Sequence, residues 1–444
     1  MPARANRNIL FACRSFKSGP RWLSKTLLAA ALCLPFFLGC QTEKLPNYPP
    51  AYREYAYVTN GKSNDVSVVD LLTFKEIKTI PVGAGPTGVI ANPKKNEVYV
   101  VNSDAGTLSV IDAEQNSVTA IIGLHKRPYF VDLTPDGVRA VIANAGSANV
   151  SIVDLNQRKE IAAIAVGDQP GLARVSPDGS LAVVTNREDA TISVIDLNAL
   201  KVRSIVHVCK TPEEIAIVPD SSQAFITCSS VNQIAVVALR PEATPAPAAA
   251  PVPQKSNTQK SNAKPHLKGK NTPIPPQPGD RTSPDRLIAI LDVGATPVHV
   301  TVKPDGGEVF VSNFGSNSVS ELITSTDEVS SAHLVGAQPV RSIVSPDNAL
   351  LYVSSFGSNA VAVYSIDDGQ LVQTIPVGAR PDALAFTPSG HYLLVVDSGS
   401  GDVAVIRRDN EVNANLLFTM VPTGLEPRQI TVKNFMLRKP PPKL

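Results

Sequence analysis

The side chains most able to do chemistry in this chain are cysteines, histidines and scattered carboxylates. The five cysteines form no Cys-x-x-Cys or Cys-x-x-Cys-His motif, so thiol redox, zinc-knuckle and haem-attachment functions have no support. The six histidines include no His-Glu-x-x-His motif and no close pair, which disfavours metal catalysis. No Gly-x-Ser-x-Gly, phosphate-loop or dinucleotide motif is present either. Any site must therefore be built from residues that the fold brings together.

A repeat of 42 residues indicates which elements position those residues. Its most regular feature is a loop of the form Gly-x-x-Pro, and a further proline follows seven residues after each one. Turn residues come next, as in Thr134-Pro135-Asp136-Gly137, where proline presets the turn and glycine supplies a positive φ. The repeat therefore places a hairpin after each loop. The loop prolines are Pro86, Pro128, Pro170, Pro212, Pro297, Pro339 and Pro381.

Each period also contains aromatic and β-branched runs that are typical of strands. Examples are Tyr57-Val58-Thr59-Asn60, Tyr99-Val100-Val101-Asn102 and the alternating Ile192-Ser193-Val194-Ile195-Asp196. Four such segments fit in one period, and none of them has helical spacing. Four-stranded sheets repeated at about 40 to 45 residues are the signature of a β-propeller, so we expect an all-β fold.

These residues resemble the YVTN family of β-propeller repeats, whose motif stands intact at Tyr57-Val58-Thr59-Asn60. The resemblance covers residues 54–433, although Cys228, Ser355 and Asp397 replace the motif asparagine. The chain begins with three strands and ends with one lone strand at 427–433, which we expect to complete the first blade. This closure predicts eight blades, whereas the family often has seven, which is the alternative.

The N-terminal region predicts where in the cell the protein is located. Residues 1–39 read as a signal peptide, because a basic segment precedes an apolar run at 26–38 that is too short to span a bilayer. The run ends in a sequence that resembles a bacterial lipobox, so Cys40 is the expected lipidation site and 40–53 a tether. An ordinary cleaved signal and an uncleaved anchor are the alternatives. By resemblance to the lipoprotein sorting rule, Gln41 implies the outer membrane, facing the periplasm or the cell surface.

Residues 241–285 interrupt the fifth blade between its third and fourth strands. They are rich in Pro, Ala, Ser, Asn and Lys, with few large apolar residues, so we expect a disordered basic insertion. It either contacts an anionic surface or carries a Pro-rich ligand motif, or it is a tolerated solvated loop. Beyond the propeller, 434–444 is expected to be a C-terminal tail.

Two cysteines fall inside the repeat and replace residues that the other copies keep. Cys209 stands for the glycine of Gly-x-x-Pro, and Cys228 stands for the motif asparagine. Both should arrive at the same rim of their blade, on adjacent strands. We therefore expect a disulfide, which an envelope location permits, with two separate thiols as the alternative.

A ligand site on a propeller is expected where the repeat varies around the axis. The residues beside each Gly-x-x-Pro proline should line one mouth of the central channel, and they are mixed in charge. They either hold a small polar ligand or a peptide, or satisfy one another around a water-filled channel. Phe314 and Phe356 in the adjacent rim loops are further contact candidates. The channel-mouth candidates are Arg127, Tyr129, Phe130, Glu213, Glu214, His299, Arg341, Arg380, Asp382 and Arg428.

Charge and composition narrow the function classes. Lys and Arg number 41 against 39 Asp and Glu, but six of the bases lie in the first 39 residues. The rest of the chain therefore has more acids than bases. Nucleic acid is not an expected partner, because phosphate binding needs an excess of Lys and Arg. We expect a monomeric, membrane-anchored, non-catalytic binding or scaffold module for an unidentified envelope protein or surface polymer, without a cofactor. The alternative is a lactonase-like hydrolase that uses acidic residues at the channel mouth, since propellers of the wider resemblance group include lactonases. Its candidate residues are Glu213, Glu214, Asp382 and His299. A haem d1-like role would need axial histidines and a quinone-like role would need tryptophan docking repeats. Both roles are disfavoured, and the predicted propeller contains no tryptophan.

Overall fold

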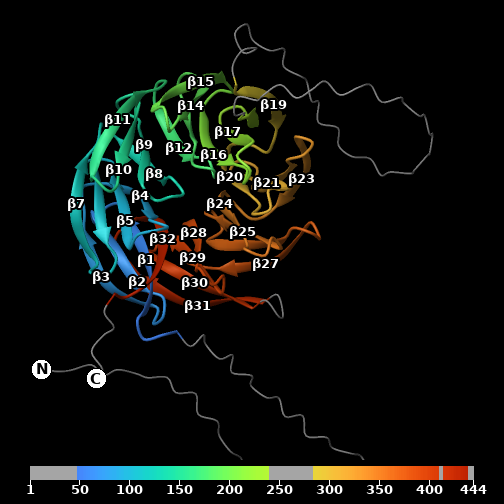
Figure 1. Ribbon diagram of the computed structural model, residues 1–444. Helices are drawn as coiled ribbons and strands as arrows, with labels where there is room; N and C mark the ends of the chain where they lie inside the picture. The colour runs from blue at the N-terminus through green and yellow to red at the C-terminus, as the bar shows by residue number, and fades with distance from the viewer. Residues whose placement is uncertain (1–47, 240–283, 410–413, 439–444) are drawn as a thin grey trace, which may run out of the picture. The chain divides into compact units, whose positions relative to one another are not determined.

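The strands of this chain form eight four-stranded antiparallel sheets arranged as the blades of a ring (Figure 1). The computed structural model describes residues 48–239, 284–409 and 414–438. All of these strands belong to one compact unit, Pro49–Leu444. The predicted all-β propeller with eight blades is confirmed. In the described ranges, no helix has the length and apolar character needed to cross a bilayer.

The strands lie in four layers from the channel outward. The innermost strands are β4 (Pro86–Ala91), β8 (Pro128–Leu133), β12 (Pro170–Val175), β16 (Pro212–Ile217), β20 (Pro297–Val302), β24 (Pro339–Val344), β28 (Pro381–Phe386) and β32 (Pro427–Met436). The second strands are β1 (Tyr52–Asn60), β5 (Glu97–Asn102), β9 (Arg139–Asn144), β13 (Leu181–Asn186), β17 (Gln223–Cys228), β21 (Glu308–Asn313), β25 (Leu350–Ser355) and β29 (Tyr392–Asp397). The third strands are β2 (Asp65–Asp70), β6 (Thr107–Asp112), β10 (Asn149–Asp154), β14 (Thr191–Asp196), β18 (Gln233–Ala238), β22 (Ser318–Ile323), β26 (Ala360–Ser365) and β30 (Asp402–Asp409). The outermost strands are β3 (Lys75–Pro81), β7 (Ser117–Gly123), β11 (Lys159–Ala165), β15 (Lys201–His207), β19 (Arg286–Asp292), β23 (Glu328–Leu334), β27 (Gln370–Pro376) and β31 (Ala414–Pro422).

The two middle layers carry the core because both of their faces pack against neighbouring blades. In β5, every residue from Val98 to Asn102 is buried. The outermost strand β11 instead alternates between exposed and partly buried residues over most of its length. Continuous Val and Ile runs therefore mark strands with two covered faces, and alternation marks a strand with one solvent face.

The ring closes through the first blade. Strand β32 pairs antiparallel with β1, from Tyr52 opposite Met436 to Asn60 opposite Pro427. This is the predicted closure. The pairing begins two residues before the expected 54–60 and continues three residues past the expected 427–433. The first and last strands thus cover each other's edges, which leaves no open blade in the ring.

The motif asparagine ties the second strand of a blade to the third. Asn102 donates from Nδ2 to Thr107 Oγ1 at 3.0 Å and to Ser109 Oγ at 2.9 Å. Equivalent pairs of hydrogen bonds recur at Asn60, Asn144, Asn186 and Asn313. Because these side chains are fully buried, each bond also satisfies a donor that would otherwise be costly. This is the physical reason for the repeated motif.

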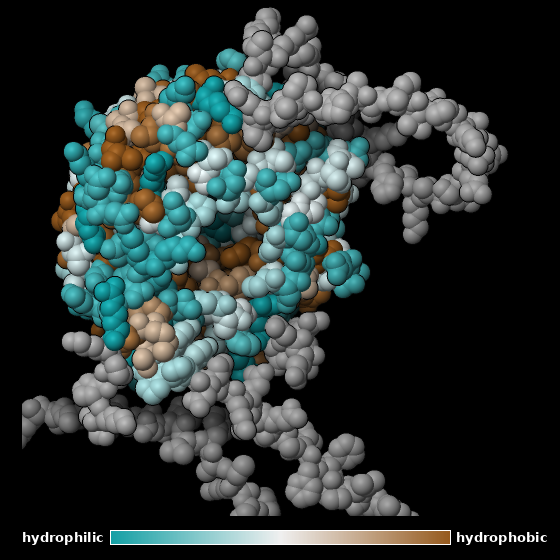
Figure 2. Space-filling view, viewed as in Figure 1, coloured by the Kyte–Doolittle hydropathy of each residue, from teal (hydrophilic) through white to brown (hydrophobic). Residues whose placement is uncertain are grey.

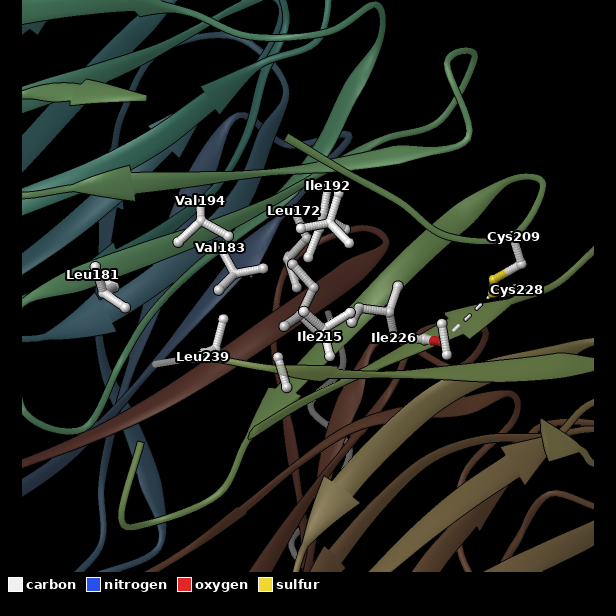
Figure 3. Packing of buried hydrophobic residues seen from close by; sticks show 14 residues of the cluster. Leu172, Leu181, Val183, Ile192, Val194, Cys209, Ile215, Ile226, Cys228 and Leu239 are labelled. Carbon is white, nitrogen blue, oxygen red and sulfur yellow. Dashed lines mark hydrogen bonds between the residues drawn. A yellow bond between two sulfur atoms is a disulfide. The ribbon is translucent and has the colours of Figure 1, made fainter. Parts of the chain in front are cut away.

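The fifth blade replaces that hydrogen-bonded asparagine by a disulfide. The structure joins Cys209 to Cys228, with Cα atoms 5.8 Å apart, at the edge of the apolar cluster between blades four and five (Figure 3). In the second blade, a Cβ added at the equivalent Gly83 would come within 2.8 Å of the Asn102 side chain. Two cysteines at such close positions have the spacing that a disulfide requires.

The insertion leaves and rejoins the fifth blade between β18 and β19, as its sequence position predicts. Its expected range of 241–285 lies outside the described residues, apart from the last two positions. Asp285 is fully buried and accepts hydrogen bonds from Arg203 Nε at 3.1 Å and from Ser204 Oγ. This carboxylate joins the start of the outer strand β19 to the outer strand β15 of the preceding blade.

Candidate functional site

The mouth of the channel is built from the loops that enter the innermost strands. In all eight blades the residue before the loop proline has a positive φ, between 48° and 62°. Its backbone N–H is held in four blades by an asparagine Oδ1 of the preceding blade, at 2.8 to 3.0 Å. The conformation is unfavourable for β-branched Thr211 and Thr296, so these loops are fixed by their neighbours. The eight residues are Gly85, Arg127, Gln169, Thr211, Thr296, Gln338, Arg380 and Glu426.

A cavity of about 410 Å³ opens at this mouth. Figure 2 shows a hollow at the centre of the ring in which hydrophilic and hydrophobic surfaces meet. Eight of the ten predicted channel-mouth residues line the cavity. They are Tyr129, Phe130, Glu213, Glu214, Arg341, Arg380, Asp382 and Arg428.

The remaining sequence candidates lie elsewhere. Arg127 is exposed on the rim and does not line the cavity, although it shares the backbone conformation of Arg380. His299 lines a second cavity of about 420 Å³ deeper in the channel. Phe314 and Phe356 are each half-buried, and the Arg380 guanidinium lies 5.7 Å from the centre of the Phe356 ring.

Two arginines that line the mouth were not among the sequence candidates. Arg174 lies four residues after Pro170 on the innermost strand β12, and Arg187 directly follows the motif residue Asn186. A comparison of the residues that follow the motif asparagine in each repeat would have singled out Arg187. Arg174 was missed because the comparison of repeats stopped two residues after the proline.

An ion-paired bridge crosses the channel between the two cavities. Glu214 accepts hydrogen bonds from Arg174 Nη2 and Arg341 Nη1, both at 2.9 Å, and Arg341 Nε lies 3.5 Å from Asp382 Oδ1. Arg174 also stacks 4.5 Å from the centre of the Phe130 ring. The partners come from blades four, five, seven and eight, so the bridge holds distant parts of the ring together. Both cavities are lined by Arg174 and Arg341.

The bridge sets the charge of the channel. Burial alone would raise the pKa of Glu214, but Arg174, Arg341 and the nearby His299 hold it at about 2. Burial and the adjacent Arg341 lower the pKa of His299 to about 3. The imidazole is therefore neutral at ordinary pH, and its Nδ1 accepts a hydrogen bond from the backbone N–H of Ser342 at 3.2 Å.

Glu214 and His299 both have pKa values well below neutral pH. A general base works best with a pKa near the working pH, and Glu214 and His299 are both far below it. Within the described ranges, no group of three or more His, Cys, Asp or Glu is placed to hold a metal ion. What the mouth presents is a set of guanidiniums, the half-exposed ring of Tyr129 and two carboxylates, Glu213 and Glu426.

Comparisons with known proteins agree on the fold. The family model described as a lactonase, seven-bladed β-propeller, matches residues 323–418, which correspond to about two of the eight blades. The chain therefore resembles part of that family but closes with eight blades instead of seven. A search of curated protein sequences finds no significant match.

Solved structures show the same architecture at low sequence identity. Dihydro-heme d1 dehydrogenase NirN is 12% identical with a TM-score of 0.63, over 87% of this chain and 77% of that one. Hydrazine synthase of Kuenenia stuttgartiensis is 20% identical with a TM-score of 0.52, over 72% and 95%. A putative 6-phosphogluconolactonase of Bacteroides uniformis is 16% identical with a TM-score of 0.54, over 86% and 99%. These similarities establish the β-propeller fold.

Proposed function

We propose that this chain is a YVTN-type envelope lipoprotein whose propeller is a non-catalytic binding or scaffold module for an envelope protein or a surface component. The mouth of the channel is the recognition site. The monomeric propeller presents a rigid, ion-paired mouth, and the rest of the ring serves as its frame.

The observation that carries this proposal is the Arg174–Glu214–Arg341 bridge. Glu214 is the most buried carboxylate in the mouth, and two guanidiniums occupy its oxygens. An acid held this way is a poor general base, because its pKa of about 2 gives it little affinity for a proton. The same bridge stiffens the channel wall, which favours recognition by a preformed surface.

The address in this proposal rests on the sequence. Cys40 would carry the lipid, residues 1–39 would be removed, and 40–53 would tether the propeller to the membrane. These positions lie outside the described residues, apart from 48–53, of which Tyr52 and Arg53 belong to strand β1. Mass spectrometry of the N-terminal peptide of the native protein tests this part: a diacylated or triacylated Cys40 supports it, and a retained leader contradicts it.

Affinity capture with cross-linking from detergent-solubilised envelopes tests the recognition role. The full chain is compared with a Tyr129→Ala/Arg428→Ala variant and with a chain lacking residues 241–285. We expect a partner that the deletion retains and the mouth variant loses. Loss with the deletion alone would make the basic insertion the binding element, and the absence of any reproducible partner would contradict the scaffold role.

A lactonase-like hydrolase is the second candidate. The partial match to the lactonase family model favours it, and so does the likeness to two putative 6-phosphogluconolactonase structures. Glu213 and Asp382, from separate blades, would then supply the acid–base groups, because the low pKa values of Glu214 and His299 make these two poor bases. Hydrolysis of sugar lactones by the full chain, abolished by Glu213→Gln and retained by Arg127→Gln, would establish this candidate in place of the binding role.

A further inference from the structure

We propose that the channel mouth binds an oxyanion, a carboxylate or phosphate group of a small molecule or of a larger partner, on the guanidiniums of Arg187, Arg380 and Arg428. This inference deepens the proposed function, because it assigns a ligand chemistry to the same mouth. It follows from how the charges of the cavity divide into a balanced inner group and an outer group with an excess of cations.

The inner group is neutral overall. Arg174 and Arg341 are balanced by Glu214 and Asp382 at 2.9 to 3.5 Å. Charges paired at such distances inside a protein have little attraction left for a ligand. The inner group therefore forms the floor of the mouth and does not bind the ligand's charge.

The outer group has more cations than free anions. Within the described part of the chain, Arg187 and Arg380 make no ion pair, and Arg428 Nη2 lies 3.7 Å from Glu426. Glu426 is itself paired with Lys62 outside the cavity. Glu213 is the one remaining lining carboxylate and forms no ion pair. The outer mouth thus carries an excess of positive charge over a concave surface, which favours an anionic ligand.

Arg187 has the features of a residue kept for a ligand. Its Nε is buried and has no hydrogen-bond partner among the described residues. Unsatisfied buried donors are costly, so one beside a cavity indicates a group that a ligand supplies. A planar guanidinium offers parallel N–H donors that match a carboxylate or a phosphate.

The backbone makes room for Arg187 and Arg428 in the same way. Arg187 follows the motif residue in blade four and lies against Gly171, the residue after the loop proline, where a Cβ would come within 2.8 Å of Arg187 Nε. In blade one the two positions are exchanged. Arg428 follows the loop proline and lies against Gly61, where a Cβ would come within 2.4 Å of Arg428 Nε. In each blade, glycine leaves the space that lets the arginine lie along the wall.

Arg380 is the third arginine of the outer group, and Arg127 is a matched control for it. Its backbone N–H is held by Asn359 Oδ1 at 3.0 Å, and its guanidinium stacks on Phe356. Arg127 occupies the same position of blade three, with φ of 54° against 56° for Arg380. Arg127 does not line the cavity. The two arginines share a backbone φ, and only Arg380 lines the cavity.

The test is isothermal titration calorimetry of the full chain in detergent, with inorganic phosphate in one arm and succinate in the other. We expect saturable binding in at least one arm, and the arm that binds more tightly identifies the group. Arg187→Gln and Arg380→Gln should each weaken binding about 10-fold or more, because each removes charge-assisted hydrogen bonds. Arg127→Gln should change it less than 2-fold, and Glu213→Gln should tighten it because a like charge is removed.

Melting temperatures of all variants serve as the folding control. Absence of saturable binding in both arms would overturn the inference, as would an equal loss in Arg127→Gln and Arg380→Gln. These outcomes are distinct from failure of the proposed function. That function fails if no partner is captured or if a lactone is turned over, whether or not phosphate or succinate binds.

Discussion

The frame, by which we mean the strands of the eight blades, and the channel mouth are built from the same repeat. The frame keeps the same residues in most blades, whereas the mouth varies them. In the frame, five of the eight blades keep the same asparagine and the same pair of hydrogen bonds. In the mouth, the residue after the loop proline differs in nearly every blade, from Gly171 to Tyr129 to Arg428. A buried position of the repeat has the same packing environment in every blade and therefore needs the same residue. A position that faces the channel axis is not packed in this way and can vary. Stability should therefore depend on the frame and recognition on the mouth.

The Arg174–Glu214–Arg341 bridge lies in the mouth but should contribute strongly to stability. Glu214→Ala would remove the ion-pair partner of Arg174 and leave Arg341 with Asp382 alone, and we expect a loss of about 3 to 5 kcal/mol in the free energy of unfolding. Urea denaturation measures it. The neighbouring Glu213→Gln removes a carboxylate that makes no ion pair and serves as the control. A stability equal to wild type in Glu214→Ala would show that the bridge is not structural.

The disulfide of the fifth blade should have the next largest effect. Breaking the Cys209–Cys228 bond releases a loop with a sequence separation of 19 residues, and the chain-entropy model gives a loss of about 3 kcal/mol. Denaturation curves with and without reductant measure this change. A Cys209→Ser/Cys228→Ser variant should be insensitive to the reductant. If the variant responds as the wild type does, the reductant acts at some other place.

Removing a motif asparagine should cost less, and by the same amount in different blades. Asn102→Ala and Asn144→Ala each delete one buried and one partly buried hydrogen bond and leave a buried serine hydroxyl without its partner. We therefore expect a loss of about 1 to 3 kcal/mol in each case. Thermal and urea unfolding provide the values. Unequal losses would mean that the repeat conceals different environments.

In the eighth blade Asp397 replaces the motif asparagine, and we expect the stability of the protein to depend on pH for this reason. Burial and a hydrogen bond with Asp402 raise the pKa of Asp397 to about 8. The folded state therefore holds a proton that the unfolded chain loses near pH 4, so stability should fall as the pH rises from about 4 through 8. Asp397→Asn recreates the Asn60–Asp65 pairing of the first blade. It should flatten the decline and stabilise the protein by about 1 kcal/mol at pH 8. A decline as steep as that of the wild type would assign the effect to another group.

The smallest expected effect on stability belongs to the mouth. The Tyr129 ring is 43% exposed, and Tyr129→Ala should change the free energy of unfolding by less than about 0.5 kcal/mol. Chemical denaturation measures this value, and capture of the envelope partner measures recognition. A large loss of stability in this variant would place Tyr129 in the frame instead of the mouth.

The frame was predictable from the sequence because its signals repeat. Eight copies of a loop proline, a hairpin and a strand motif indicate the blades, and the lone final strand indicates the closure. Asp285 was not separable from the insertion, because its burial depends on Arg203 and Ser204 in another blade. A pairing across 81 or 82 residues leaves no local pattern.

The mouth was predictable in position but not in detail. Alignment on the loop proline brought eight candidates into one cavity, because that proline fixes where each innermost strand begins. His299 was misplaced because its side chain turns toward the deeper cavity. The cross-channel bridge could not be foreseen, since it depends on the distance between opposite blades and hence on the number of blades in the ring.

Hydrogen–deuterium exchange of the full chain, with and without saturating phosphate or succinate, tests most directly whether recognition lies where the repeat varies. We predict slower exchange in peptides covering 127–131, 185–190, 378–383 and 426–430, with the outer strands unchanged. Protection confined to 241–285 or to the outer strands would contradict it, as would no change at all.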